Sequence, residues 1–167
     1  MKVLVLVKQV PNTDSPFRIN PAGTWVDEGN LTFNLNDYDR YALEAALRLK
    51  DAGQATEVVA LSVGPERAAT ALRTCLATGA DRAVHVKDDA LQGAPPLALA
   101  RVIAAAIRSE GFSLVFGGLL ADDDNYTQVP AFWRGSWSGP APPRSSSSSC
   151  RGPRCGSSAS WRTTRCR

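Results

Sequence analysis

Apolar runs of strand length alternate with helix-length segments from the N-terminus onward, and this alternation constrains the fold more than any other feature. The first run, Val3 to Val7, is continuously apolar and rich in β-branched residues, as in a strand that is covered on both faces. Later runs of the same kind are Glu57 to Val63, Ala83 to Val86 and Phe112 to Phe116. Four such runs predict the strands of a largely buried, parallel sheet.

Each strand is followed by a segment with helix start and stop signals. Asn36 is a preferred N-cap residue before an apolar-faced helix that ends near Gly53, Pro65 opens a second helix that Gly79 closes, and Pro96 opens a third that ends near Gly111. The order strand, helix, strand predicts an α/β fold, a mostly parallel sheet with flanking helices and right-handed crossovers. Between the first strand and the first helix, Thr24 to Val26 and Leu31 to Phe33 predict a small hairpin.

In a sheet of this kind a ligand binds beyond the carboxyl ends of the strands, where the strand order reverses. Three segments meet there: Leu6 to Val10, Ser62 to Pro65, and the loop Gly117 to Asn125. A helix predicted to start near Thr127 leaves backbone N–H groups for a phosphate. Neither a Walker loop nor a G-x-G-x-x-G motif is present in the sequence.

Charge divides the chain into two parts. Residues 1–132 hold 12 Lys and Arg against 16 Asp and Glu, whereas the last 35 residues hold seven Arg and no acid, although the whole chain carries a net charge of only +3. No apolar stretch is long enough for a membrane span, and Val3 to Val7 is too short for a signal-peptide core. Of four Cys, only Cys75 lies in the first part, as expected in a reducing compartment. These features predict a cytoplasmic protein without membrane insertion.

Several short motifs, taken in order, carry a family resemblance. They are Lys2-Val3-Leu4-Val5-Leu6-Val7-Lys8-Gln9-Val10-Pro11, Gly23-Thr24-Trp25-Val26, Tyr41-Ala42-Leu43-Glu44-Ala45-Ala46-Leu47, Gly64-Pro65-Glu66-Arg67, Thr78-Gly79-Ala80-Asp81-Arg82 and Asp122-Asp123-Asp124-Asn125. With this order and spacing, residues 1–132 resemble the electron transfer flavoprotein beta subunit. The resemblance implies an adenine-nucleotide alpha-hydrolase-like, Rossmann-like domain, here incomplete.

The same resemblance implies a function as an electron carrier subunit rather than an enzyme. Members pair with an alpha subunit that holds most of the FAD, accept electrons from acyl-CoA and other dehydrogenases in fatty acid β-oxidation, and pass them to a membrane quinone oxidoreductase. The beta subunit holds a structural AMP, and Tyr38 approaches the flavin side of the interface. By position, the cofactor-binding residues are Leu6, Asn36, Asp37, Tyr38, Asp39, Val63, Gly117, Gly118, Leu119, Leu120, Ala121, Asp122, Asp123, Asp124, Asn125, Tyr126, Thr127 and Gln128. No catalytic residue and no metal site are expected.

Some residues depart from the family or admit two interpretations. Asp37 stands where members usually have Pro, and Gly118 and Leu119 replace a basic residue and a Gln, which weakens phosphate binding because charge-assisted donors are the stronger ones. The carboxylates of residues 122–124 repel phosphate and are assigned to ribose hydroxyls, loop structure or solvent, with a divalent-cation site as the weaker alternative. Lys8 is either a phosphate partner or an exposed charge. His85 and Cys75 are interpreted as packed residues.

The segment 133–167 has two interpretations. It is rich in Ser, Arg and Pro, has no helical or strand periodicity, and is predicted to be unstructured. Residues 133–140 can be written in codons that one restored base before Trp133 re-reads as Val-Ala-Gly-Leu-Leu-Val-Trp-Pro, which favours a segment translated out of frame after about Phe132. The other interpretation is a disordered basic arm that binds nucleic acid or an acidic surface. For the chain as a whole, an alternative function is a stand-alone adenine-nucleotide-binding module of the universal-stress-protein type.

Overall fold

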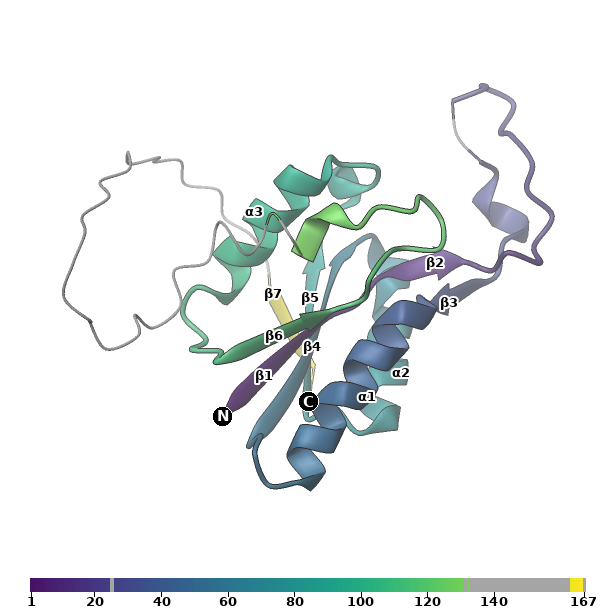
Figure 1. Cartoon of the computed structure of the whole chain (residues 1–167). Coiled ribbons are helices and arrows are strands. Elements are labelled where there is room, and N and C mark those ends of the chain that lie inside the picture. The colour runs from purple at the N-terminus through teal and green to yellow at the C-terminus, as the bar shows by residue number, and fades with distance from the viewer. Residues whose placement is uncertain (25, 131, 133–162, 167) are drawn as a thin grey trace, which may run out of the picture.

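The computed structural model describes residues 1–24, 26–130, 132 and 163–166. A central sheet lies between two layers of helix, with α1 (Asp37–Asp51) and α2 (Ala69–Thr78) on one face and α3 (Pro96–Ile107) on the other (Figure 1). This is the predicted α/β arrangement, a mostly parallel sheet with flanking helices. Short 3-10 turns, η1 (Glu28–Asn30), η2 (Glu66–Ala68) and η3 (Asp89–Leu91), join the elements.

The sheet has the order β6-β1-β4-β5-β7. Its four parallel strands are β1 (Lys2–Leu6), β4 (Glu57–Gly64), β5 (Arg82–Lys87) and β6 (Leu114–Gly117). From β1 the chain adds β4 and β5 on one side and then returns through α3 to place β6 on the other side of β1. The strand order therefore reverses between β1 and β6, and a crevice is expected beyond their carboxyl ends.

Side chains of successive strand residues point to opposite faces, so each strand contributes to two cores. Val3, Val5 and Val58 pack in the cluster with α1 and α2, whereas Leu4 and Val59 pack in the cluster with α3. All five side chains are fully buried. Full burial of one such side chain stabilises a fold by roughly 1.5–3 kcal/mol, which explains why these runs are continuously apolar rather than alternating.

An arm formed by residues 12–32 leaves the body between two short strands. β2 (Gln9–Pro11) pairs antiparallel with β3 (Phe33–Leu35), and the arm extends beyond this ladder at the right of Figure 1. The predicted hairpin between residues 24–26 and 31–33 is therefore wrong. Val26 pairs with Ile19 in an isolated bridge, whereas Phe33 in β3 pairs with Pro11 in β2, the short strand that follows β1.

The C-terminal segment contributes one described strand. β7 (Thr163–Cys166) pairs antiparallel with β5, which differs at these four residues from the prediction of an unstructured segment. Two consecutive Thr favour strand geometry, and β5 offers an open edge for backbone pairing. The prediction for 133–162 and 167 lies outside the described residues. Over the described part of the chain, no helix has the length and apolar character needed to cross a membrane.

Candidate nucleotide site at the strand crossover

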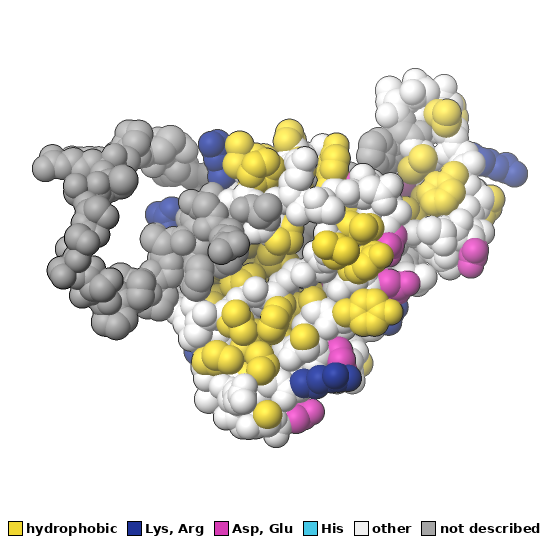
Figure 2. Space-filling view, in the orientation of Figure 1, with side chains coloured by type: hydrophobic (Ala, Val, Ile, Leu, Met, Phe, Trp, Pro, Cys, Tyr) yellow, Lys and Arg dark blue, Asp and Glu magenta, His cyan; other side chains and the backbone are white. Residues whose placement is uncertain are grey.

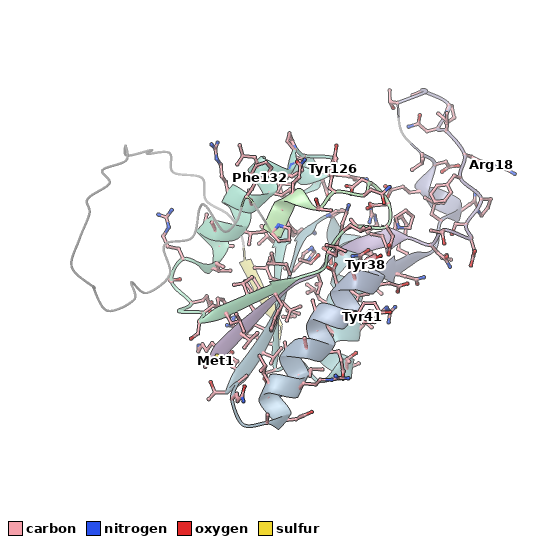
Figure 3. The ribbon with its side chains drawn as sticks, viewed as in Figure 1. Met1, Arg18, Tyr38, Tyr41, Tyr126 and Phe132 are labelled. Atoms are coloured by element: carbon pink, nitrogen blue, oxygen red, sulfur yellow. The ribbon has the colours of Figure 1, made fainter. Side chains whose placement is uncertain are left out.

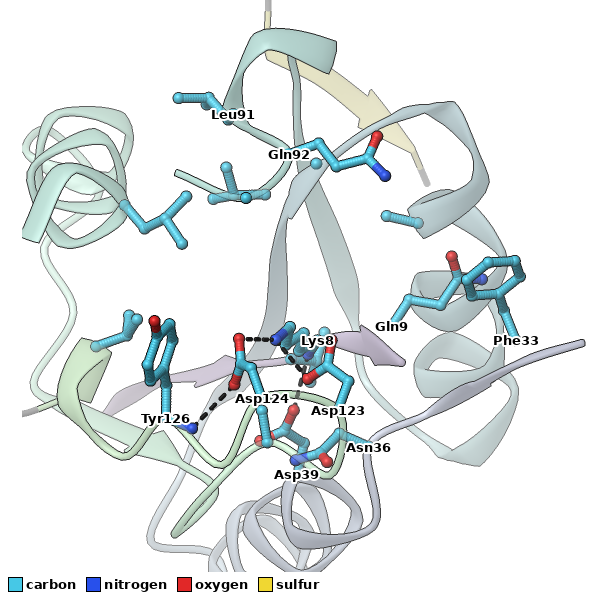
Figure 4. Close-up of a pocket in the computed structure, with 18 of the residues that line it drawn as sticks. Lys8, Gln9, Phe33, Asn36, Asp39, Leu91, Gln92, Asp123, Asp124 and Tyr126 are labelled. Atoms are coloured by element: carbon cyan, nitrogen blue, oxygen red, sulfur yellow. Dashed lines mark hydrogen bonds and ion pairs between the residues drawn. The ribbon is translucent and has the colours of Figure 1, made fainter. Parts of the chain in front are cut away.

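A cavity of about 420 Å³ lies beyond the carboxyl ends of β1, β4 and β6. This volume is within the range of pockets that bind small molecules. Leu6, Val63 and Ile103 form part of its apolar wall, and the polar side chains Lys8 and Asn36 also line it (Figure 4). The cavity therefore coincides with the point where the strand order reverses, which is the predicted binding edge.

A buried carboxylate joins the ends of β1 and β6. The backbone N–H of Lys8, just past β1, donates to Asp39 Oδ2 at 2.7 Å, and the backbone N–H of Gly118, just past β6, donates to Asp39 Oδ1 at 3.0 Å. Asp39 lies in the first turn of α1 and is only 6% exposed. We call these three residues the Asp39 clasp. The clasp holds two backbone segments that no strand pairing connects.

Gly118 allows this close approach because it has no side chain. A Cβ atom at residue 118 would meet the Asp39 carboxylate and would lie 2.9 Å from both the carbonyl carbon and the Cβ of Tyr38. In this structure no residue larger than Gly fits at 118 without displacing the clasp.

Asn36 holds the loop after β6 from a second side. Its Nδ2 donates to the Leu120 carbonyl at 2.9 Å, and its Oδ1 accepts from the Asp122 backbone N–H at 3.0 Å. Asn36 occupies the predicted N-cap position of α1, but its side chain makes no capping hydrogen bond. Its amide is used to pair with a backbone segment more than 80 residues away, which a local capping rule does not predict.

The aspartates of residues 122–124 maintain the shape of the same loop. Asp123 and Asp124 accept from Lys8 Nζ at 2.6 and 2.8 Å, and Asp124 also accepts from the Tyr126 backbone N–H at 2.9 Å (Figure 4). Asp122 Oδ2 accepts from the Asp37 backbone N–H at 3.3 Å. Of the roles considered for these carboxylates, the structure shows the one in loop structure. Lys8 is paired with these two carboxylates, and a phosphate contact of Lys8 stays a prediction.

Burial dominates the electrostatics of the clasp. Desolvation raises the pKa of Asp39 from 3.8 to about 6, and hydrogen bonds from Lys8, Asn36 and Gly118 oppose part of this rise. Asp39 is therefore ionised at neutral pH but becomes protonated in mildly acidic solution. The Lys8 ammonium also lowers the pKa of Asp39, by a smaller Coulombic effect.

A second polar group lies at the opposite side of the cavity and fastens the arm. Arg67 donates to both carboxylate oxygens of Glu28, at 3.1 and 3.2 Å, and to Gln9 Oε1 at 3.1 Å, while its guanidinium lies 4.1 Å from the centre of the Phe33 ring. Gln92 donates to Glu28 Oε1 at 2.6 Å. These side chains bring the arm, the turn after β4 and η3 to one wall of the cavity.

Eleven of the predicted cofactor-binding residues line the cavity and seven do not. Those that line it are Leu6, Asn36, Asp39, Val63, Gly117, Gly118, Leu120, Ala121, Asp123, Asp124 and Tyr126. Those that do not are Asp37, Tyr38, Leu119, Asp122, Asn125, Thr127 and Gln128. Residues 128–130 are helical, close to the helix start predicted at Thr127. The assignment of a ligand to these residues remains a prediction.

The sequence did not predict the contacts of Arg67 with the arm at one wall of the cavity. Arg67 was part of the Gly-Pro-Glu-Arg motif, yet nothing in that motif indicates that Glu28 and Phe33 reach it from the arm.

His85 is buried, and its Nε2 lies 3.1 Å from the Gly64 carbonyl oxygen, which agrees with a packed residue. Burial likewise raises the pKa of Cys75 to about 11, which makes its thiol unreactive. Among the described residues, no three His, Cys, Asp or Glu side chains converge as metal ligands.

Comparison with known proteins connects this site to a family. The model of the electron transfer flavoprotein domain matches residues 24–131. The electron transfer flavoprotein subunit beta of Methylophilus methylotrophus is 41% identical over 130 residues, which are 77% of this chain and 49% of that relative. The mitochondrial subunit beta of Oryza sativa subsp. indica is 44% identical over 131 residues, 77% of this chain and 52% of the relative.

A third relative has a more specific name. The Caffeyl-CoA reductase-Etf complex subunit CarD of Acetobacterium woodii is 42% identical over 131 residues, 77% of this chain and 49% of the relative. The chain thus spans about half the length of the curated relatives it matches. The family match covers more than half of the chain and includes the whole loop from Gly117 to Gln128. The chain therefore belongs to the electron transfer flavoprotein family, and two of these three relatives are beta subunits.

Proposed function

We propose that this chain binds AMP in the cavity beyond β1 and β6 and pairs with an electron transfer flavoprotein alpha subunit. The observation that carries the proposal is the position of the cavity, which lies at the strand crossover and is lined by eleven of the residues that the family resemblance assigned to the nucleotide. The choice of an adenine nucleotide as the ligand comes from the family resemblance of the sequence motifs.

The residues present fit an adenine nucleotide better at its base than at its phosphate. Leu6, Val63 and Ile103 give the adenine ring an apolar wall. Lys8 is already paired with two carboxylates, so a phosphate would have to compete with Asp123 and Asp124 for this charged donor. AMP binding by this chain is therefore expected to be weaker than a cationic phosphate site would allow.

The electron-carrier role follows from the family and is part of the same proposal. The alpha subunit would hold most of the FAD, with Tyr38 of this chain toward the flavin side of the interface. Acyl-CoA and other dehydrogenases would supply the electrons, a membrane quinone oxidoreductase would accept them, and the complex would work in the cytoplasm. Because the chain spans about half of its relatives, we expect it to carry little or no electron transfer by itself.

Calorimetric titration of the full 167-residue chain with AMP tests the nucleotide part. Saturable binding of AMP, with adenosine as the phosphate-free control, is expected, and no heat with either ligand would contradict the proposal. Mixing with the alpha subunit that accompanies the Methylophilus relative, followed by size-exclusion chromatography at the flavin absorbance, tests the pairing. Co-elution supports it, whereas separate elution with AMP bound would indicate the stand-alone nucleotide module instead.

We further propose that residues 133–167 are translated out of frame. The family match ends at residue 131, and composition changes at the same place, from a mixed acidic sequence to one with seven Arg and no acid. Resequencing of the coding DNA across the codons for Val129 to Pro140 tests this. A missing base would support the proposal, and confirmation of the present frame would contradict it.

A further inference from the structure

We propose that Asp39 is a positioning residue for the nucleotide site: by accepting from Lys8 and Gly118, its carboxylate sets the width of the crevice between β1 and β6 without contacting the ligand. This inference rests on the proposed function for its ligand, but the clasp itself is a property of the described structure. It assigns Asp39 a different role from that of a residue which binds AMP directly.

The first step of the argument is that both Asp39 oxygens are in use. Oδ2 accepts from Lys8 N at 2.7 Å and Oδ1 accepts from Gly118 N at 3.0 Å, and the residue is 6% exposed. A ribose hydroxyl or an adenine amino group would have to compete with a backbone N–H for the same carboxylate oxygen. Because an unpaired buried N–H is costly, the two backbone bonds prevail over a ligand contact.

The second step concerns what the clasp joins. The ladder between β1 and β6 ends at the pair Leu6 and Gly117, so Lys8 and Gly118 lie in the two segments that diverge beyond it. The side-chain amide of Asn36 bonds to the later part of the loop, at Leu120 and Asp122. Asp39 is thus the side chain that ties the two strand ends together at the mouth of the crevice.

The third step is that the clasp depends on charge. A carboxylate is an acceptor at both oxygens, whereas a protonated carboxyl turns one oxygen into a donor that faces an N–H. Lys8, at the end of β1, is the charged group that acts on Asp39, and on α2 the Cys75 thiol is a titratable group whose pKa Asp39 raises in turn. Asp37 and Arg40 are its charged neighbours in the sequence of α1. Burial places the ionisation of Asp39 near pH 6, so the clasp is complete at neutral pH and incomplete at pH 5.

The variant Asp39→Asn tests the inference because its amide has the same shape but only one acceptor oxygen. Asp51→Asn, at the exposed far end of α1, is the matched control. Amide hydrogen exchange of the full chain at pH 7 gives a readout without any ligand. In Asp39→Asn we expect the protection factor of the Lys8 amide or of the Gly118 amide to fall at least tenfold. In Asp51→Asn we expect the protection factors of both amides to be unchanged. Full protection of both amides in Asp39→Asn would overturn the inference.

AMP titration then separates positioning from a merely structural role. In Asp39→Asn we expect affinity for AMP to fall at least tenfold while the midpoint of thermal unfolding is unchanged or raised, because the variant no longer buries a charge. A parallel fall of both quantities would indicate a structural role and overturn the inference. If the exchange result is as expected but the wild type binds no AMP, the proposed function fails and the clasp stands.

The pH profile provides the final readout. The wild type should bind AMP about tenfold more weakly at pH 5 than at pH 7, since only the fraction with ionised Asp39 is competent. A phosphate monoester also titrates near pH 6, so the wild-type profile is compared with that of Asp39→Asn, in which the ligand's own titration remains. Identical profiles in the two proteins would contradict the inference.

Discussion

The two polar sides of the cavity are built in different ways. On the β1/β6 side, Asn36 and Asp39 are buried side chains that hold backbone N–H and C=O groups. On the arm side, Arg67 and Glu28 are about one-third exposed side chains that hold each other. Backbone groups that lose a buried partner stay unpaired, whereas exposed ions that lose a partner return to water. The β1/β6 side therefore determines the geometry of the site, whereas the arm side holds a wall of the cavity that can detach without leaving buried groups unpaired.

The largest effect is expected from Gly118→Ala. The new Cβ would overlap the Asp39 carboxylate and the Tyr38 backbone, so we expect destabilisation of about 3 kcal/mol, the upper part of the range for overpacking, together with loss of AMP binding. Urea unfolding and calorimetric titration measure the two effects. Gly111→Ala is the control: its position has φ of +67° and open space around it, so it should lower stability without affecting AMP binding. Normal AMP affinity in Gly118→Ala would show that the clasp does not determine the site.

The next effect is a pH dependence of stability that belongs to Asp39. Its pKa is raised in the folded state from 3.8 to about 6, so its contribution to stability is fully present below pH 4 and is lost as the pH rises through 6. A shift of this size corresponds to about 3 kcal/mol. Between pH 7 and pH 4, the free energy of unfolding of the wild type should therefore rise relative to that of Asp39→Asn.

The comparison between the two proteins removes the contributions of other groups. Glu57 and Asp81 have lowered pKa values in the folded state, so both proteins lose their contributions as the pH falls. Urea titrations at four or five pH values suffice. A difference that stays constant with pH would mean that Asp39 is not buried as a charge at pH 7.

Asn36→Ala should have a smaller effect on stability. The change leaves the Leu120 carbonyl and the Asp122 N–H without their partner, and we expect a loss of about 1–3 kcal/mol, the usual cost of an unpaired buried polar group. Asn20→Ala, in the exposed arm, is the control and should change stability by less than about 0.5 kcal/mol. Equal effects of the two variants in urea unfolding would contradict the contrast between buried and exposed polar contacts.

The smallest effect is expected from Arg67→Ala. The ion pair with Glu28 and the stacking on Phe33 are partly exposed, and together they should contribute no more than about 1 kcal/mol. Limited proteolysis of the arm should nevertheless become faster, since three fastening contacts are removed. Arg67→Lys is the control, because it keeps the charge but not the paired donors. If Arg67→Ala destabilised the fold as much as Gly118→Ala, the arm would have to be regarded as part of the core.

The sequence predicted the helices and the strands of the parallel sheet well, because they depend on local patterns. It predicted long-range contacts poorly, because these depend on residues far away in the sequence. Strands such as Val3 to Val7 follow from local apolar runs, and the carboxyl-end rule then places Leu6, Val63 and Gly117 at one edge. The hairpin at residues 24–33 was wrong because the true partner of β3 lies beyond β1 rather than nearby.

The roles of individual polar residues depend on such long-range neighbours. Asn36 has the signature of a helix cap, yet its amide is committed to Leu120 and Asp122. Lys8 had equal claims to a phosphate and to solvent, and it instead pairs with Asp123 and Asp124. Periodicity reports which face of an element is buried, but it carries no information about which polar group on another element completes a pair.

The two edge strands of the sheet, β6 and β7, each have one partner among the described strands. They differ in what lies next to them, because the last residue of β6 leads directly into Gly118 and the Asp39 clasp. A chain that extends the sheet at β6 would therefore also alter the mouth of the cavity. At that edge, assembly and ligand affinity would be thermodynamically linked through a single strand.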